Sequence, residues 1–75
     1  MKKRSVSISG HRTSISLEED FWQLLNEMAQ EQKRPLAQLI ADIDRNRMKA
    51  VEPPNLSSAL RIHVLRTVLA RSEKA

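Results

Sequence analysis

The fold is decided by a short stretch, Arg12-Thr13-Ser14-Ile15-Ser16-Leu17, which leads directly into a helical pattern. Its polar and apolar side chains alternate, which is the period of a half-buried strand. Because the rest of the chain reads mostly as helix, this strand has few neighbours for its backbone donors and acceptors. We therefore expect the same strand of a second copy to pair with it antiparallel about a two-fold axis. The resulting two-stranded ribbon, with Arg and Ser outward, has the dimensions to enter the DNA major groove.

The residues before this strand, 1–11, are basic and then rich in serine. One interpretation folds residues 4–9 back as a hairpin, with Val6 opposite Ile15 and Gly10 supplying the positive φ of the first turn position. The other is a mobile basic arm that contacts DNA phosphates. We favour the arm, because a hairpin would occupy one edge of the strand that should pair across the dimer.

Two amphipathic helices are predicted next, over residues 18–32 and 35–47. The first has carboxylates in its opening turn, where the helix dipole favours them. The second starts at Pro35, a residue suited to a first helical turn. The short basic turn between them indicates a compact helical hairpin. The apolar stripes are Phe21, Trp22, Leu24, Leu25, Met28 and Ala29 in the first helix, and Leu36, Leu39, Ile40 and Ile43 in the second. Together they exceed what one short chain should bury, which again predicts an obligate dimer.

A third helix is predicted over residues 56–71, after a linker at 49–55 that contains Pro53 and Pro54. Asn55 is a suitable N-cap for it. Its apolar residues form two stripes: Leu56, Leu60, Val64 and Val68 on one side, and Ile62, Leu65 and Leu69 on the other. A helix that is apolar on two sides usually contacts two partners. We expect it to be an addition to the core that packs on the dimer or bridges neighbouring dimers on DNA.

Composition narrows the class of protein. A chain of 75 residues forms one domain at most and is marginal by itself, and without cysteine it has no disulfide or thiolate metal site to stabilise it. The net charge of +4 and pI of about 10.1 suit a polyanionic partner such as nucleic acid. The apolar runs are too short to span a membrane, so a cytoplasmic protein is expected.

The sequence contains no pattern that predicts catalysis. His11 and His63 lack partners at metal-ligand spacing, and there is no Ser-His-Asp arrangement and no Gly-rich phosphate loop. We expect neither an enzyme nor a bound cofactor or metal.

The order of strand, helix, basic turn and helix over residues 12–48 resembles the ribbon-helix-helix DNA-binding family. Within that family the chain is most similar to a bacterial subgroup with three features. These are a Gly-x-Arg-Thr-Ser strand, seen here at 10–14, a Phe-Trp pair, seen at 21–22, and an Asn-Leu-Ser-Ser-Ala segment, seen at 55–59.

The resemblance implies a mainly α fold with one short strand, an intertwined homodimer, with the third helix added. Together with the pattern along the chain, it divides the sequence into an arm (1–11), a core (12–48), a linker (49–55) and the third helix (56–71). It assigns base contacts to Arg12, Ser14 and Ser16. Phosphate contacts, from the resemblance and from charge, are expected at Lys2, Lys3, Arg4, Lys33, Arg34, Leu36 and Ala37.

Two residues depart from the family pattern. Many members have Gly in the turn where this chain has Lys33, and a left-handed Lys costs about 1 kcal/mol. Many have Ser or Thr as the cap of the second helix where this chain has Pro35, which lacks both a hydroxyl and an N–H for a phosphate.

We expect a sequence-specific regulator that binds double-stranded DNA, most simply a repressor. The alternative is an antitoxin, in which the segment after residue 48 neutralises a toxin protein. A third interpretation is a helical interaction module without a DNA role.

Overall fold

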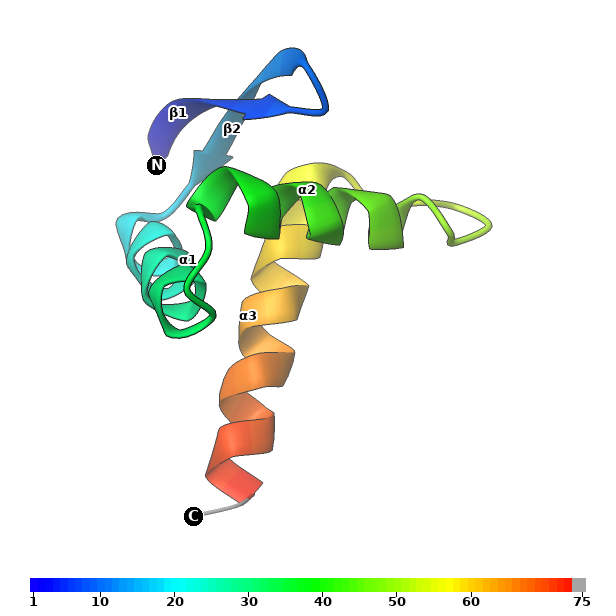
Figure 1. The fold of residues 1–75 in the computed structure, drawn as a ribbon. Coiled ribbons are helices and arrows are strands. Elements are labelled where there is room, and N and C mark those ends of the chain that lie inside the picture. The colour runs from blue at the N-terminus through cyan, green and yellow to red at the C-terminus, as the bar shows by residue number, and fades with distance from the viewer. Residues whose placement is uncertain (74–75) are drawn as a thin grey trace.

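The computed structural model describes residues 1–73, and it places a two-stranded antiparallel sheet ahead of three helices (Figure 1). The strands are β1 (Lys2–Ile8) and β2 (His11–Leu17), and the helices are α1 (Glu19–Glu31), α2 (Leu36–Arg47) and α3 (Leu56–Glu73). The hairpin lies beside the start of α1 and over α2, while α3 runs away from it toward the C-terminus. The fold is therefore mainly α with one short ribbon.

The N-terminal residues form a strand, so the expected basic arm over residues 1–11 is wrong. β1 pairs with β2 along its whole length, from Ile8 opposite His11 to Lys2 opposite Leu17. The cause is the two-residue loop Ser9-Gly10, whose φ values of 51° and 83° define a type I′ turn with the twist that a hairpin requires. Gly10 occupies the second turn position, not the first as expected.

The turn also sets the register, which differs from the predicted one. Arg4, not Val6, lies opposite Ile15, and Val6 lies opposite Thr13. With β1 in place, β2 has a full partner within its own chain. The first argument for pairing through a second copy therefore does not hold.

One hydrophobic core joins all five elements. Trp22 and Leu25 of α1, Ile40 of α2 and Leu17 of β2 are each 0% exposed. The Trp22 indole Nε1–H donates to the carbonyl oxygen of Lys2 at 2.9 Å, which ties α1 to the end of β1. A single chain thus buries the central positions of both helical stripes, contrary to the expectation that they require a dimer.

The α1–α2 turn ends α1 with a left-handed residue, as the family resemblance implied. Lys33 has a φ of 56°, and its N–H donates to the Gln30 carbonyl at 3.0 Å. The Arg34 N–H donates to the Ala29 carbonyl at 3.1 Å, which completes a Schellman motif. Pro35, with ψ of 147°, is the N-cap of α2 and precedes its first helical residue.

The third helix begins where predicted but is part of the core. The Asn55 side-chain oxygen accepts the Ser58 N–H at 2.8 Å, which confirms the N-cap. Leu60 and Val64 are buried at 0% and 2% exposure, so α3 is not an addition to a core made by residues 12–48. Within residues 1–73, no helix is both long enough and apolar enough to cross a membrane.

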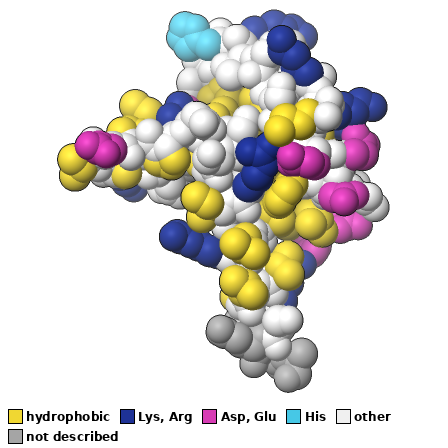
Figure 2. All heavy atoms as spheres, turned by 180° about the vertical axis from the view of Figure 1, so that it is seen from behind, with side chains coloured by type: hydrophobic (Ala, Val, Ile, Leu, Met, Phe, Trp, Pro, Cys, Tyr) yellow, Lys and Arg dark blue, Asp and Glu magenta, His cyan; other side chains and the backbone are white. Residues whose placement is uncertain are grey.

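The second stripe of α3 remains in contact with water. It consists of Ile62, Leu65 and Leu69, joined by Val68, which was predicted in the other stripe with Leu60 and Val64. Figure 2 shows hydrophobic side chains gathered over the part of the molecule that α3 forms.

Candidate nucleic-acid interface

One face of the β1–β2 hairpin is polar, basic and turned away from the core. The register places Lys3, Ser5 and Ser7 of β1 directly opposite residues of β2. Their partners are Ser16, Ser14 and Arg12 respectively. Directly opposed residues lie on the same face of a sheet. All six are exposed except Ser16, which is half-buried, and neither strand contains an acidic residue. We refer to these six residues as the outer face.

The opposite face of the hairpin is anchored on the helices. Ile8, Ile15 and Leu17 belong to the hydrophobic core, and Val6 packs against it. Burial of one face fixes the alternation, because a slip of one residue would exchange buried and exposed side chains. The outer face is therefore presented by a rigid support.

The three basic residues near the N-terminus, where phosphate contacts were expected, lie on two different faces of the hairpin because side chains alternate along a strand. Lys3 lies on the outer face, whereas Lys2 and Arg4 lie on the side of α1. The Arg4 guanidinium is 3.6 Å from a Glu19 carboxylate oxygen and lies over the Trp22 ring at 5.2 Å. The Lys2 Nζ is 4.0 Å from Glu19. These two side chains remain partly exposed but are drawn toward α1.

Phosphate contacts were expected from two cations of the α1–α2 turn, Lys33 and Arg34, and the structure gives them different surroundings. Lys33 is exposed. The Arg34 side chain is only 24% exposed and forms an ion pair with Asp42, which also binds Arg45. The Arg34 guanidinium holds the pKa of the Asp42 carboxyl below its ordinary value. Arg34, where a phosphate contact was expected, is thus bound by Asp42 of α2 within the chain.

The start of α2 supplies backbone donors. The first helical hydrogen bonds run from the N–H groups of Gln38 and Leu39 to the Pro35 carbonyl, at 3.1 and 3.3 Å. The N–H groups of Leu36 and Ala37 come earlier in the helix and have no carbonyl acceptor within it, as is general for the first N–H groups of a helix. Such groups can bind an anion, even though Pro35 brings no hydroxyl.

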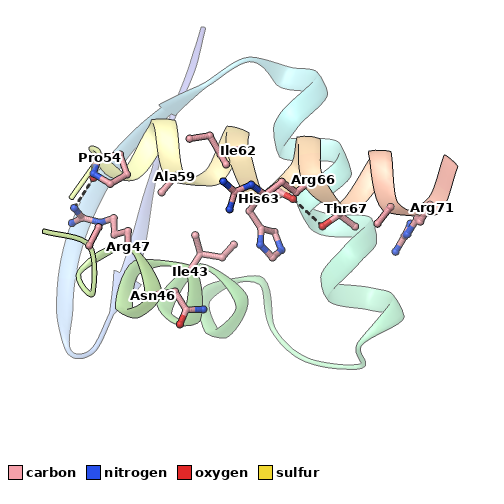
Figure 3. A pocket seen from close by; sticks show the side chains of 12 residues that line it. Ile43, Asn46, Arg47, Pro54, Ala59, Ile62, His63, Arg66, Thr67 and Arg71 are labelled. Atoms are coloured by element: carbon pink, nitrogen blue, oxygen red, sulfur yellow. Dashed lines mark hydrogen bonds between the residues drawn. The ribbon is translucent and has the colours of Figure 1, made fainter. Parts of the chain in front are cut away.

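A second basic region lines an open groove of about 770 Å³ between α2 and α3 (Figure 3). Its arginines are largely engaged within the chain. Arg47 binds Asp44 at 2.7 Å and the Pro54 carbonyl at 3.0 Å, and Arg71 binds Glu31 at 2.7 Å. Arg71 thereby joins α3 to α1, and Arg47 joins α2 to the loop that precedes α3. We therefore place the candidate interface on the hairpin.

His63 points from α3 toward α2 in this groove (Figure 3). Partial burial lowers its pKa from the ordinary value of 6.5, and the nearby positive charge of Arg34 lowers it further. The side chain thus favours the neutral form, which suits a packing position more than an anion-binding one.

The sequence analysis placed Arg12, Ser14 and Ser16 correctly on one outward face, but because it favoured the arm over the hairpin it did not place Ser5 and Ser7 beside them. A signal for them was present. The segment 5–8, Ser-Val-Ser-Ile, has the same alternation as the segment 14–17, Ser-Ile-Ser-Leu. Two segments with one pattern on either side of a Gly-containing turn are typical of a hairpin.

Comparison with known proteins gave one match. The family model described as the ribbon-helix-helix domain matches residues 1–68, which include the hairpin, α1, α2 and most of α3. Searches of curated proteins and of solved structures gave no match.

Proposed function

The chain belongs to the ribbon-helix-helix family, and from this premise we propose that it is a sequence-specific DNA-binding repressor. Members of the family are typically DNA-binding transcription regulators or antitoxins. The observation that carries the proposal is the outer face, where exposed Lys, Arg and Ser side chains stand on a ribbon whose other face is buried. A repressor acts most simply by covering a promoter.

Base reading is assigned first to β2. The Arg12 guanidinium can bind O6 and N7 of a guanine together, which is the commonest specific contact in the major groove. Ser14 and Ser16 can donate or accept hydrogen bonds there, although a hydroxyl by itself does not select one base. These three side chains alternate with the core residues Ile15 and Leu17, so their outward direction is well supported.

Phosphate contacts would fix the register of the ribbon on the duplex. Lys33 is the exposed cation nearest the start of α2, and the N–H groups of Leu36 and Ala37 lie beside it in sequence. Lys2 and Arg4, at the edge of the hairpin, would add charge at the cost of their pairing with Glu19. Arg34 is left out, since Asp42 engages its guanidinium.

We also propose a homodimer, which is general in the family and would double the DNA contacts. The apolar surface that a second copy would bury is the exposed stripe of α3: Ile62, Leu65, Val68 and Leu69.

The antitoxin alternative needs a segment after residue 48 that is free for a toxin protein. Burial of Leu60 and Val64 engages much of that segment in the core, which favours the repressor.

The test begins with selection of bound sequences from random duplex DNA by the full chain. Arg12→Ala should then weaken binding to the selected duplex by about five- to 150-fold and relax base preference at one position per half-site. Lys33→Ala should weaken selected and random duplexes alike and reduce the salt dependence by about one ion.

These two variants separate the possible outcomes. If Arg12→Ala lowers the affinity for both duplexes equally, Arg12 contacts only phosphate. If the folded wild-type chain retains no duplex at low salt, the DNA-binding proposal fails.

A further inference from the structure

We propose that the groove between α2 and α3 is a binding site for a small amphipathic carboxylate, a molecule with one anionic head group and an apolar body. None of the residues that line the groove belongs to the hairpin. The site therefore goes beyond the proposed function, and it stands or falls independently of DNA binding.

Two helical faces form the walls of the groove. On α2 the wall consists of Ile43, Asn46 and Arg47, which are three and four residues apart and so lie on one face. Figure 3 shows the Ile43 side chain on α2 and the His63 side chain on α3 directed into the space between the helices. The volume of about 770 Å³ lies within the range of sites for small ligands. The α3 wall follows the same spacing, with Ala59, Ile62, His63, Arg66, Thr67 and Ala70.

The floor of the groove is apolar. Ile43 and Ala59 are buried at 5% and 9% exposure, and Ile62 remains 40% exposed at the border. An apolar body placed here would leave water together with the surface that it covers, which is the favourable term in most binding. The floor thus calls for a ligand with an apolar part.

The charge of the walls is positive, but one cation alone is unpaired there. The lining contains three arginines and no acidic residue. Asp44 engages Arg47 and Glu31 engages Arg71. Arg66 is exposed and forms no ion pair with any side chain that the structure describes. Since His63 favours its neutral form, the groove offers one positive charge, which matches one anionic head group.

The position of Arg66 sets the length of the ligand. It follows Ala59 by seven residues of α3, a rise of about 10 Å along the helix. A ligand of about that length can rest its body over Ala59 and Ile43 while its head reaches the guanidinium. A carboxylate suits this partner, because the two can form paired hydrogen bonds.

Larger occupants fit these features less well. An acidic helix or a nucleic-acid backbone carries negative charges along its whole length, whereas the groove has one unpaired cation. A polar backbone on the apolar floor would also lose hydrogen bonds to water without replacement. The groove differs from the surface proposed for the dimer, because of that stripe only Ile62 lines it.

The first experiment is an NMR titration of the full chain with octanoate below its micellar concentration. The two histidines, His63 in the groove and His11 in the hairpin, report on different parts of the molecule. We expect saturable shifts of the His63 ring signals, with a Kd on the order of 1 mM, and unchanged His11 signals. Acetate supplies the anion without the apolar body, and octyltrimethylammonium supplies the body with the opposite charge. Neither should shift His63 at the same concentrations.

The second experiment asks whether Arg66 holds the head group. Arg66→Gln should weaken octanoate binding about tenfold, while Arg66→Lys, which keeps the charge, should retain most of the affinity. Lys49→Gln is the matched control, because it removes one positive charge from an exposed residue just after α2 that does not line the groove. Its Kd should stay within about twofold of the wild type.

Each outcome decides the inference. It is overturned if octanoate leaves the His63 signals unchanged, if the cationic compound shifts them equally, or if Arg66→Gln and Lys49→Gln bind octanoate alike. Dilution of the protein identifies one other occupant. If dilution shifts the His63 signals and octanoate does not, a second copy of the chain occupies the groove and the inference fails. Retention of duplex DNA plays no part in these measurements, so failure here differs from failure of the proposed function.

Discussion

Lys33 is an exposed residue held in a strained backbone conformation. Its φ of 56° lies in the left-handed region, where a side chain with a Cβ is disfavoured. The Schellman hydrogen bonds of the turn require that conformation. An exposed Lys at a position that suits Gly is explained most simply by its charge, which agrees with a phosphate contact.

Lys33→Gly should therefore stabilise the fold by about 1 kcal/mol while it weakens DNA binding. Chemical denaturation measures the first effect and duplex titration the second. Lys33→Ala is the control, since it removes the charge but keeps the Cβ. It should weaken binding without the gain in stability. Equal stability of the two variants would show that the turn is unstrained.

His63 should make stability depend on pH. Its pKa is lowered in the folded chain, mainly by burial and then by Arg34, so folding favours the neutral ring. The stabilising contribution is present above the ordinary pKa of 6.5 and is lost as pH falls below it, through the lowered folded value.

We expect the free energy of unfolding of the wild type to decline from pH 6.5 downward more steeply than that of His63→Gln. Denaturation at several pH values above the range in which carboxylates titrate isolates this difference. Parallel curves for the two proteins would mean that the ring is as well solvated in the folded chain as in the unfolded one.

At the level of elements, α3 decides how much of the chain is needed for folding. Leu60 is as fully buried as Leu25 of α1, at 0% exposure. Arg61 of α3 also binds Glu18 beside the start of α1 at 2.9 Å and lowers the pKa of that carboxyl. The helix is thus joined to the core by packing and to the surface by an ion pair.

Leu60→Ala should cost about 2–5 kcal/mol, as should Leu25→Ala. Leu65→Ala is the control on the same helix, and at 56% exposure it should change the stability of one chain by about 0.5 kcal/mol or less. Thermal unfolding at low protein concentration makes the comparison. If Leu60→Ala lowers the free energy of unfolding only slightly while Leu25→Ala lowers it strongly, α3 would not be part of the core.

For the whole molecule, the exposed stripe of α3 is the surface on which the proposed dimer would form. The central apolar residues of α1, α2 and β2 are buried within one chain. By contrast, four residues of α3 are each 40–56% exposed: Ile62, Leu65, Val68 and Leu69. A contiguous apolar patch on a small protein commonly marks an interaction site. We therefore expect the dimer contact on α3 in place of an intertwined ribbon.

Leu65→Glu should lower the mass measured by sedimentation from that of a dimer to that of a monomer, because a charge would be buried in the contact. The chain should stay folded, since Leu65 does not belong to its core. Met48→Glu is the control, an exposed apolar residue outside α3 that should leave the dimer intact. A dimer that survives Leu65→Glu would place the contact elsewhere.

Local pattern was enough to predict β2, the three helices, the Asn55 cap and the outward direction of Arg12, Ser14 and Ser16, whereas the left-handed Lys33 was expected only from the family resemblance. Each of these depends on residues close together in the chain, through side-chain period, capping chemistry or backbone preference. The tertiary structure decided the rest: that β1 is the partner of β2, that α3 completes the core, and that Asp42 engages Arg34. The period of the apolar residues indicates which side chains are buried, but any apolar surface can bury them. Likewise, any strand with a free edge can supply the backbone hydrogen bonds that β2 needs. Only the arrangement in space selects among those equivalent partners.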